Sequence, residues 1–239
     1  MRIDGVRALV TGASSGIGAA TVSLLTQRGA HVLSVGRNRE ALTGESLAID
    51  LTEPVAAEQI ADWAGEVDLL ICNAGQGWAG ALANMELPEI DRLITLNLLA
   101  PVTLTRLLLP AMQQRKRGHV VLVSSIAGVM GVEDEAVYAA AKGGLRTFAD
   151  SIRLAAAQDR VGVTVVVPGV VDTPFFERRG RPYDRKSPRP VPASQVARAL
   201  VTAVERNRPE VFVPGWLRLP ARLHGLAPGL VQSLQKRFG

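Results

Sequence analysis

Short apolar runs recur along the chain and alternate with longer stretches of helical character. The runs are rich in Val and Leu and show no polar alternation, which is typical of strands buried on both faces of a sheet. They lie at residues 7–10, 31–35, 47–50, 67–72, 119–123, 162–167 and 210–213. The pattern therefore predicts about seven strands.

The stretches between the runs predict helices on both sides of these strands. The expected helices are 17–28, 55–64, 88–114, 135–159 and 193–205. Strands that alternate with helices join through right-handed crossovers, so we expect an α/β fold, a Rossmann-type doubly wound parallel sheet. Residues 37–68 leave little room for a full helix between the second and third strands, and we expect a turn there.

Composition is compatible with one domain. The chain has 239 residues, 47% of them hydrophobic, and a formal charge of +5. We place the domain at 1–215, including an Arg- and Pro-rich segment at 175–192, and treat 216–239 as a basic, apolar tail. No nucleic-acid-binding module is recognisable.

Cysteine and histidine usage indicates the compartment and argues against a metal site. Cys72 is the single cysteine, and the first residues lack the apolar stretch of a signal peptide, so we expect a cytoplasmic protein. His31, His119 and His224 are scattered, which leaves a zinc ion without an obvious ligand set.

The most lipid-like stretch, 93–112, is interrupted by Asn97, Pro101 and Arg106. Polar and charged residues are costly in hydrocarbon, so we expect a buried or interface helix and no membrane span.

A glycine-rich turn, TGASSGIG, occupies residues 11–18 between the first strand and the first helix. Glycines allow close approach of a diphosphate, which the free N–H groups and the dipole of a helix N-terminus favour. The turn predicts dinucleotide contacts from Gly12, Ser15, Gly16, Ile17 and Gly18. A purely structural turn is the alternative.

Tyr138 and Lys142 stand four residues apart in the run YAAAK. This spacing places both side chains on one helix face, where an ammonium lowers the pKa of a nearby phenol. The pair predicts a tyrosine that transfers protons, although a chance spacing is the alternative.

Six motifs together resemble the short-chain dehydrogenase/reductase family in order and spacing. They are TGASSGIG, CNAG at 72–75, Asn97, Ser125, YAAAK and PGVVDT at 168–173, and the likeness covers about residues 5–215. It implies a catalytic set of Asn97, Ser125, Tyr138 and Lys142, with Ser124 as a structural neighbour.

The resemblance implies a role for each catalytic residue. Tyr138 gives its proton to a carbonyl oxygen or takes one from an alcohol, and Ser125 holds the same oxygen. Lys142 lowers the pKa of Tyr138 and hydrogen-bonds the nicotinamide ribose, and Asn97 fixes a water that links Lys142 to solvent. A homodimer or homotetramer through the helices of Asn97 and Tyr138 is also implied.

The end of the second strand indicates the cofactor. Gly36 is followed by Arg37, which suits a 2′-phosphate, so NADP(H) is favoured over NAD(H), although the glycine-rich turn contains no basic residue. The resemblance implies further cofactor contacts from Ser14, Asp50, Leu51, Asn73, Ala74, Gly75, Tyr138, Lys142, Pro168, Gly169, Val171 and Thr173.

Residues 175–192 follow the cofactor-binding motif directly, which predicts a lid over the reacting end. Phe175 and Phe176 are expected to pack on an apolar substrate. The segment also contains Arg178, Arg179, Arg181, Arg185, Lys186 and Arg189. A solvated basic loop is favoured for these six over attraction of an anionic substrate.

The tail, 216–239, combines basic and apolar residues without an acidic one. Such a segment can lie on an anionic membrane surface or pack against a second subunit. Pro220, Gly225 and Pro228 break it into short pieces, which disfavours membrane contact.

The function expected from these observations is interconversion of a carbonyl and a secondary alcohol by an NADP(H)-dependent oxidoreductase acting on a small molecule. The alternative is an NADP(H)-binding sensor or scaffold without turnover. All four catalytic side chains are retained, which favours the enzyme.

Overall fold

A seven-stranded, fully parallel sheet forms the centre of the computed structural model, which describes residues 1–229. Its strands are β1 Arg7–Thr11, β2 His31–Gly36, β3 Glu45–Ala48, β4 Leu69–Cys72, β5 Gly118–Val123, β6 Val161–Pro168 and β9 Glu210–Val213. Their order is β3-β2-β1-β4-β5-β6-β9. The doubly wound parallel sheet expected from the sequence is confirmed, and its connections change direction between β1 and β4.

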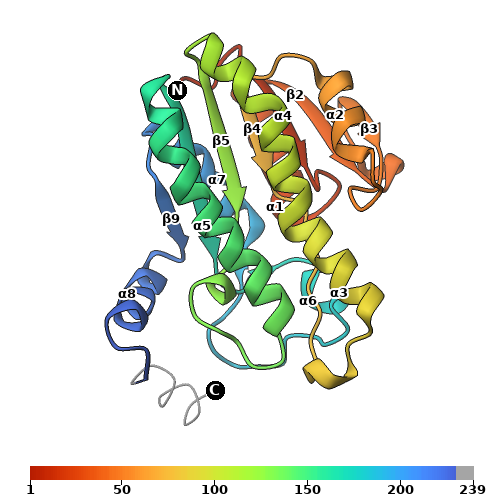
Figure 1. Ribbon diagram of the computed structural model, residues 1–239, viewed down its shortest axis with the longest axis vertical. Coiled ribbons are helices and arrows are strands. Elements are labelled where there is room, and N and C mark those ends of the chain that lie inside the picture. Colours follow the sequence, from red (N-terminus) through yellow and green to blue (C-terminus); the bar gives the residue numbers. More distant parts are fainter. Residues whose placement is uncertain (230–239) are drawn as a thin grey trace.

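Helices cover both faces of the sheet, with α4 and α5 in front of it and α1 and α7 behind it (Figure 1). The helices are α1 Gly16–Gln27, α2 Ala56–Ala64, α3 Leu87–Ile94, α4 Ala100–Gln114, α5 Ala136–Gln158, α6 Phe175–Arg178, α7 Ala193–Glu205 and α8 Arg218–Leu226. Successive side chains of a strand point to opposite faces. Leu9 of β1 accordingly joins one core cluster, while Ala8 and Val10 join the other.

The region after β2 is short, as expected, but its strand is displaced. A single 3₁₀ turn, Arg39–Ala41, replaces a crossover helix. The prediction of a third strand at 47–50 was wrong by two residues, because β3 spans Glu45–Ala48. β3 is an edge strand, and its first two side chains are polar, so the apolar pattern marks only its second half.

The long helix expected at 88–114 is interrupted by a π-helical turn, Thr95–Leu99, between α3 and α4. Pro101 has no N–H to donate to the Asn97 carbonyl, as an α-helix would require. The helix therefore widens at this point, and the Ala100 N–H donates to Thr95 O, five residues earlier. Leu87–Gln114 is long and apolar enough to cross a membrane by composition alone. It packs against the sheet, and Leu104 and Met112 belong to the core.

The segment after β6 is more ordered than a simple loop. Two short strands, β7 Val171–Asp172 and β8 Val191–Pro192, pair in parallel, and α6 lies between them. The tail begins with a 3₁₀ turn, Gly215–Leu217, and continues into α8. Leu217 is buried in the main core, whereas Trp216 is exposed, and residues 230–239 of the predicted tail lie outside the described residues.

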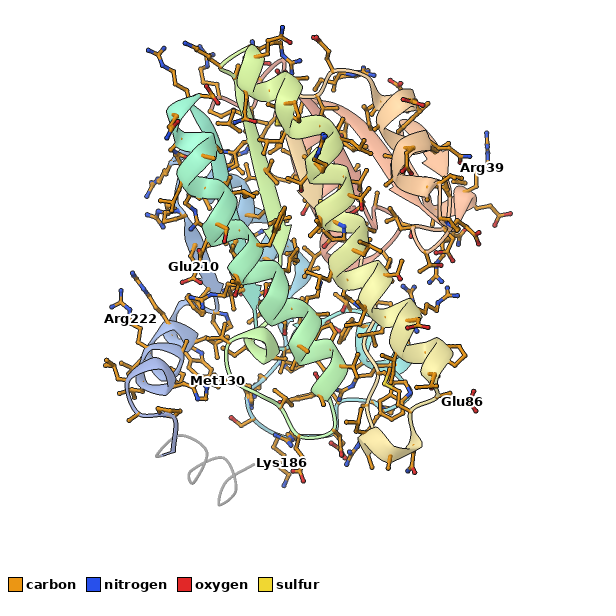
Figure 2. All side chains as sticks on the ribbon, viewed as in Figure 1. Arg39, Glu86, Met130, Lys186, Glu210 and Arg222 are labelled. Carbon is orange, nitrogen blue, oxygen red and sulfur yellow. The ribbon has the colours of Figure 1, made fainter. Side chains whose placement is uncertain are left out.

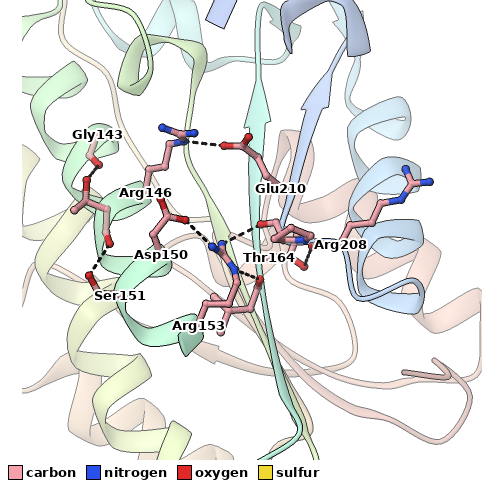
Figure 3. A network of polar contacts seen from close by, with 11 residues as sticks. Gly143, Arg146, Asp150, Ser151, Arg153, Thr164, Arg208 and Glu210 are labelled. Carbon is pink, nitrogen blue, oxygen red and sulfur yellow. Dashed lines mark hydrogen bonds and ion pairs between the residues drawn. The ribbon is translucent and has the colours of Figure 1, made fainter. Parts of the chain in front are cut away.

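A polar network ties α5 to the far edge of the sheet (Figure 3). Arg146 Nε donates to Glu210 of β9 at 2.7 Å. Arg153 Nε donates to the carbonyl of Val163 on β6 at 3.1 Å, and Arg153 Nη2 donates to that of Pro209 at 3.1 Å. These contacts fix the helix that carries Tyr138 and Lys142 against the strands that border the site.

Candidate active site

A pocket of about 1430 Å³ opens at the carboxyl ends of the strands. In doubly wound sheets, ligands bind in this crevice, where the strand order reverses. Every predicted site residue lines the pocket except Gly18 and Asn97. Gly18 packs against the glycine-rich turn, since a Cβ there would lie 2.0 Å from Gly12 O. Asn97 is buried directly behind the pocket wall.

The glycine-rich turn adopts a backbone conformation that depends on its glycines. Gly12 and Gly16 have φ of +67° and +54°, a conformation that side chains other than glycine rarely adopt. A Cβ on Gly12 would also lie 2.8 Å from Ala74 Cα. Asn73 Nδ2 donates to Thr11 O at 3.0 Å, so the CNAG motif holds the turn in place.

The opposite end of the pocket combines two arginines with one carboxylate. Arg37 Nη1 lies 3.8 Å from Asp50, and Arg92 Nη2 lies 3.0 Å from it. Partial burial raises the pKa of Asp50, but hydrogen bonds from Thr52 and the two arginines outweigh that effect and hold it below its usual value. Arg92 lies on α3 and also lines the pocket, although no sequence motif marks it.

Tyr138 lies in the pocket wall with 7% of its surface exposed, and the side chain of Ser125, two residues after β5, hydrogen-bonds with it. Burial raises the pKa of Tyr138 above its ordinary value, Glu135 adds to this, and Ser125 and Arg179 offset only part of it. Burial sets the net direction, and Lys142 is not among the groups that shift this pKa, so the lowering expected from Lys142 stays a prediction.

Lys142 is buried, with 3% of its surface exposed. Its Nζ donates to the carbonyl of Val123 at 2.9 Å and lies 5.9 Å from the centre of the Tyr138 ring. Burial lowers the pKa of Lys142 to about 8. Ser124 Oγ donates to the Lys142 carbonyl at 2.9 Å, in line with the structural role expected for this serine.

Asn97 lies in the π-helical turn and is fully buried. Its Nδ2 donates to the carbonyls of Gln76 and Leu93, each at 2.9 Å. Its Oδ1 is buried without a hydrogen-bond partner among the described residues. A Cβ on Gly75 would lie 2.8 Å from this oxygen and 3.3 Å from Lys142 Nζ. The unpaired acceptor and the ammonium thus flank one point next to Gly75.

Residues of the predicted lid, 175–192, line the pocket next to Tyr138. The Phe175 ring lies 5.5 Å from that of Tyr138, and Phe176 continues the aromatic series toward Tyr183 at 5.2 Å. Both predicted phenylalanines line the pocket. The segment therefore presents apolar surface beside the Tyr138 ring.

A buried ion pair at the lid base was missed by the sequence reasoning. Arg179 pairs with Glu135, and 11% of each side chain is exposed. Arg179 also stacks on Phe176 at 4.6 Å. Burial raises the pKa of Glu135, with Asp134 contributing, although Arg179 and Arg185 act against it. Sequence alone suggested a solvated arginine, because the pairing joins segments 44 residues apart.

Fold and site together define a nucleotide-binding oxidoreductase. The family model described as short chain dehydrogenase matches residues 7–184, and the chain belongs to this family. Ketoacyl reductase HetN of Nostoc sp. is 34% identical over 99% of this chain and 90% of its own length. The 3-oxoacyl-[acyl-carrier-protein] reductase FabG of Escherichia coli is 33% identical over 72% of this chain and 76% of its own.

Solved structures agree with the fold. A short-chain dehydrogenase from Sphingobium yanoikuyae in complex with NADPH has a TM-score of 0.84 at 25% identity and covers 98% of this chain and 96% of its own. A short-chain dehydrogenase/reductase from Burkholderia phymatum in complex with NAD has a TM-score of 0.85 at 20% identity, with 96% of both chains covered.

Proposed function

We propose that this protein is an NADP(H)-dependent oxidoreductase that interconverts a carbonyl group and a secondary alcohol. The observation that carries the proposal is the convergence of Ser125, Tyr138 and Lys142 at one end of the pocket, with Asn97 behind them. A nicotinamide dinucleotide, when bound, supplies or accepts the hydride. The glycine-rich turn and the unpaired oxygen of Asn97 beside Gly75 fit such a group.

Tyr138 acts as the proton donor in the reductive direction. A phenol with an ordinary or raised pKa is protonated at neutral pH, which is the state a general acid needs. Ser125 hydrogen-bonds with Tyr138 and orients the substrate oxygen next to the Tyr138 hydroxyl. In the reductive direction the substrate oxygen receives the Tyr138 proton, and the phenolate is then reprotonated from solvent.

Lys142 and Asn97 provide the route for that proton. With a pKa of about 8, Lys142 can give up or accept a proton near neutral pH. The free Oδ1 of Asn97 accepts a hydrogen bond from a water beside Gly75, and this water connects Lys142 to solvent. The two residues thus return the proton that Tyr138 donates.

Preference for NADP(H) is proposed from the charge at the adenosine end of the pocket. Arg37 is 54% exposed and lines the pocket, so its guanidinium can face a 2′-phosphate. Arg92 adds a second positive charge against the single carboxylate of Asp50. The NADPH complex of the Sphingobium relative is consistent with this assignment.

The substrate is proposed to be a carbonyl compound with an apolar chain. Phe175 and Phe176 of the lid and the exposed Trp216 all line the pocket. The two relatives described as ketoacyl and 3-oxoacyl reductases make 3-oxoacyl compounds the first substrates to test.

The proposal is tested by replacing Tyr138 with Phe and following the loss of NADPH absorbance with a 3-oxoacyl substrate. Loss of the general acid is expected to lower kcat by about 10²- to 10⁴-fold while NADPH binding is retained. Tyr183→Phe is the matched control, because its hydroxyl donates to Pro188 O in the lid. Full activity of the Tyr138 variant refutes the mechanism. A wild-type protein that binds NADPH but turns over no carbonyl compound supports a sensor instead.

A further inference from the structure

The short helix α6 brings a lid arginine to the glycine-rich turn. Arg178 Nη1 donates to Ser15 Oγ at 3.1 Å, although the two residues are 163 positions apart in the sequence. Ser15 directly precedes the first turn of α1, and both side chains line the pocket. The guanidinium of Arg178 thus lies next to the N-terminus of α1, whereas the sequence favoured a solvated basic loop for the arginines of this segment.

The backbone of α6 is held in place from two sides. Arg179, the next residue, forms the buried pair with Glu135. On the other side, Thr173 packs against the turn, since a Cβ on Gly16 would lie 2.9 Å from Thr173 Cγ2. Arg178 is therefore presented to the turn by a segment whose flanking residues are anchored.

The charges around the glycine-rich turn indicate which ligand group the Arg178 guanidinium binds. Residues 11–18 contain no Lys or Arg, so the turn itself offers a diphosphate N–H groups, the hydroxyls of Ser14 and Ser15 and the helix dipole, but no cation. A guanidinium binds phosphate oxygens with two parallel hydrogen bonds. Arg178 is the cation that contacts this turn through Ser15.

We propose that Arg178 binds the diphosphate of the dinucleotide cofactor and so joins the lid to the cofactor. The proposal rests on the proposed function, because it requires a dinucleotide in the pocket. Arg178 is then a cofactor-binding residue that acts at the diphosphate, while Arg37 acts at the 2′-phosphate. The two arginines should respond differently to truncated ligands.

The experiment measures Kd by isothermal titration calorimetry for four probes, which are NADPH, NADH, ADP-ribose and 2′-AMP. The first three contain the diphosphate, and 2′-AMP lacks it. In Arg178→Gln the Kd of NADPH, NADH and ADP-ribose is expected to rise about tenfold, because one hydrogen bond to a charged group is lost. The Kd of 2′-AMP should not change. Arg178→Lys should show a smaller rise.

Lys186→Gln is the matched control, because it removes the same charge from the same segment. Lys186 is exposed and points away from the fold (Figure 2). Its substitution should leave all four Kd values within twofold. Thermal melts of the ligand-free variants establish that each is folded.

Each remaining outcome counts against the proposal. An unchanged Kd for ADP-ribose in Arg178→Gln overturns it, and tighter binding shows that Arg178 competes with the ligand. Equal weakening of 2′-AMP assigns the effect to general electrostatics. A wild-type protein that binds neither NADPH nor ADP-ribose overturns the proposed function as well, whereas normal wild-type binding with an unaffected variant overturns this inference alone.

Discussion

The buried charge of Lys142 predicts a specific dependence of stability on pH. Burial lowers the pKa of Lys142 from an ordinary 10.5 to about 8. Between these values the unfolded chain binds more protons than the folded protein, so the free energy of unfolding rises with pH. At about 1.4 kcal/mol per pH unit the whole effect is about 3 kcal/mol, and about 2 kcal/mol of it falls between pH 7 and pH 9.5.

Urea unfolding of the wild type and of Lys142→Met at these two pH values isolates the effect. The loss of the hydrogen bond to Val123 O acts on the variant at both pH values, so it largely cancels. The wild type should gain about 2 kcal/mol relative to the variant on going to pH 9.5. Lys186→Met, which removes an exposed lysine, should follow the wild type. A wild-type-minus-Lys142→Met difference that stays constant with pH would refute the desolvation of Lys142.

Two further predictions concern charged pairs. Arg179→Ala should lower the free energy of unfolding by about 3 to 5 kcal/mol, because it leaves Glu135 buried without its partner. Arg181→Ala removes the ion pair with Asp134, in which the two side chains are 60% and 35% exposed. It should lower the free energy of unfolding by about 0 to 1 kcal/mol. Equal losses in urea unfolding would contradict the burial argument. Arg37→Asp should raise the KM for NADPH at least tenfold and lower that for NADH, and an unchanged preference in initial-rate measurements would remove the assignment.

The positions of the four proposed catalytic residues could be predicted because Tyr138 and Lys142 share a helix-face spacing, and because the order of the six motifs points to Asn97 and Ser125. The glycine-rich turn, Ser125 and the Tyr138–Lys142 pair also lie at the ends of strands or on a helix that the apolar pattern identifies. Parallel strands bring their carboxyl ends to one edge, so these motifs meet there. The sheet and the site therefore follow from local signals combined with topology.

Features that depend on burial or on distant partners could not be predicted in this way. The i, i+4 rule describes the proximity of Tyr138 and Lys142 on a helix, but the direction of the tyrosine pKa depends on desolvation by the whole pocket. Arg178 and Arg179 are adjacent and chemically identical in the sequence. Their different contacts, with Ser15 and Glu135, follow only from where α6 lies.

The π-helical turn at Thr95–Leu99 has a consequence for how this chain tolerates insertions and deletions. A π turn accommodates one residue more than the α-helical path between the same two ends. Deleting one residue within it would remove the extra residue and leave the packing of α3 and α4 largely in register, and the continuous helix would bend at Pro101, which still lacks an N–H. The same deletion would rotate Asn97 away from Gly75. A one-residue deletion at this point should therefore abolish turnover while the protein still folds. The position of Asn97 thus depends on the π turn, whereas folding does not.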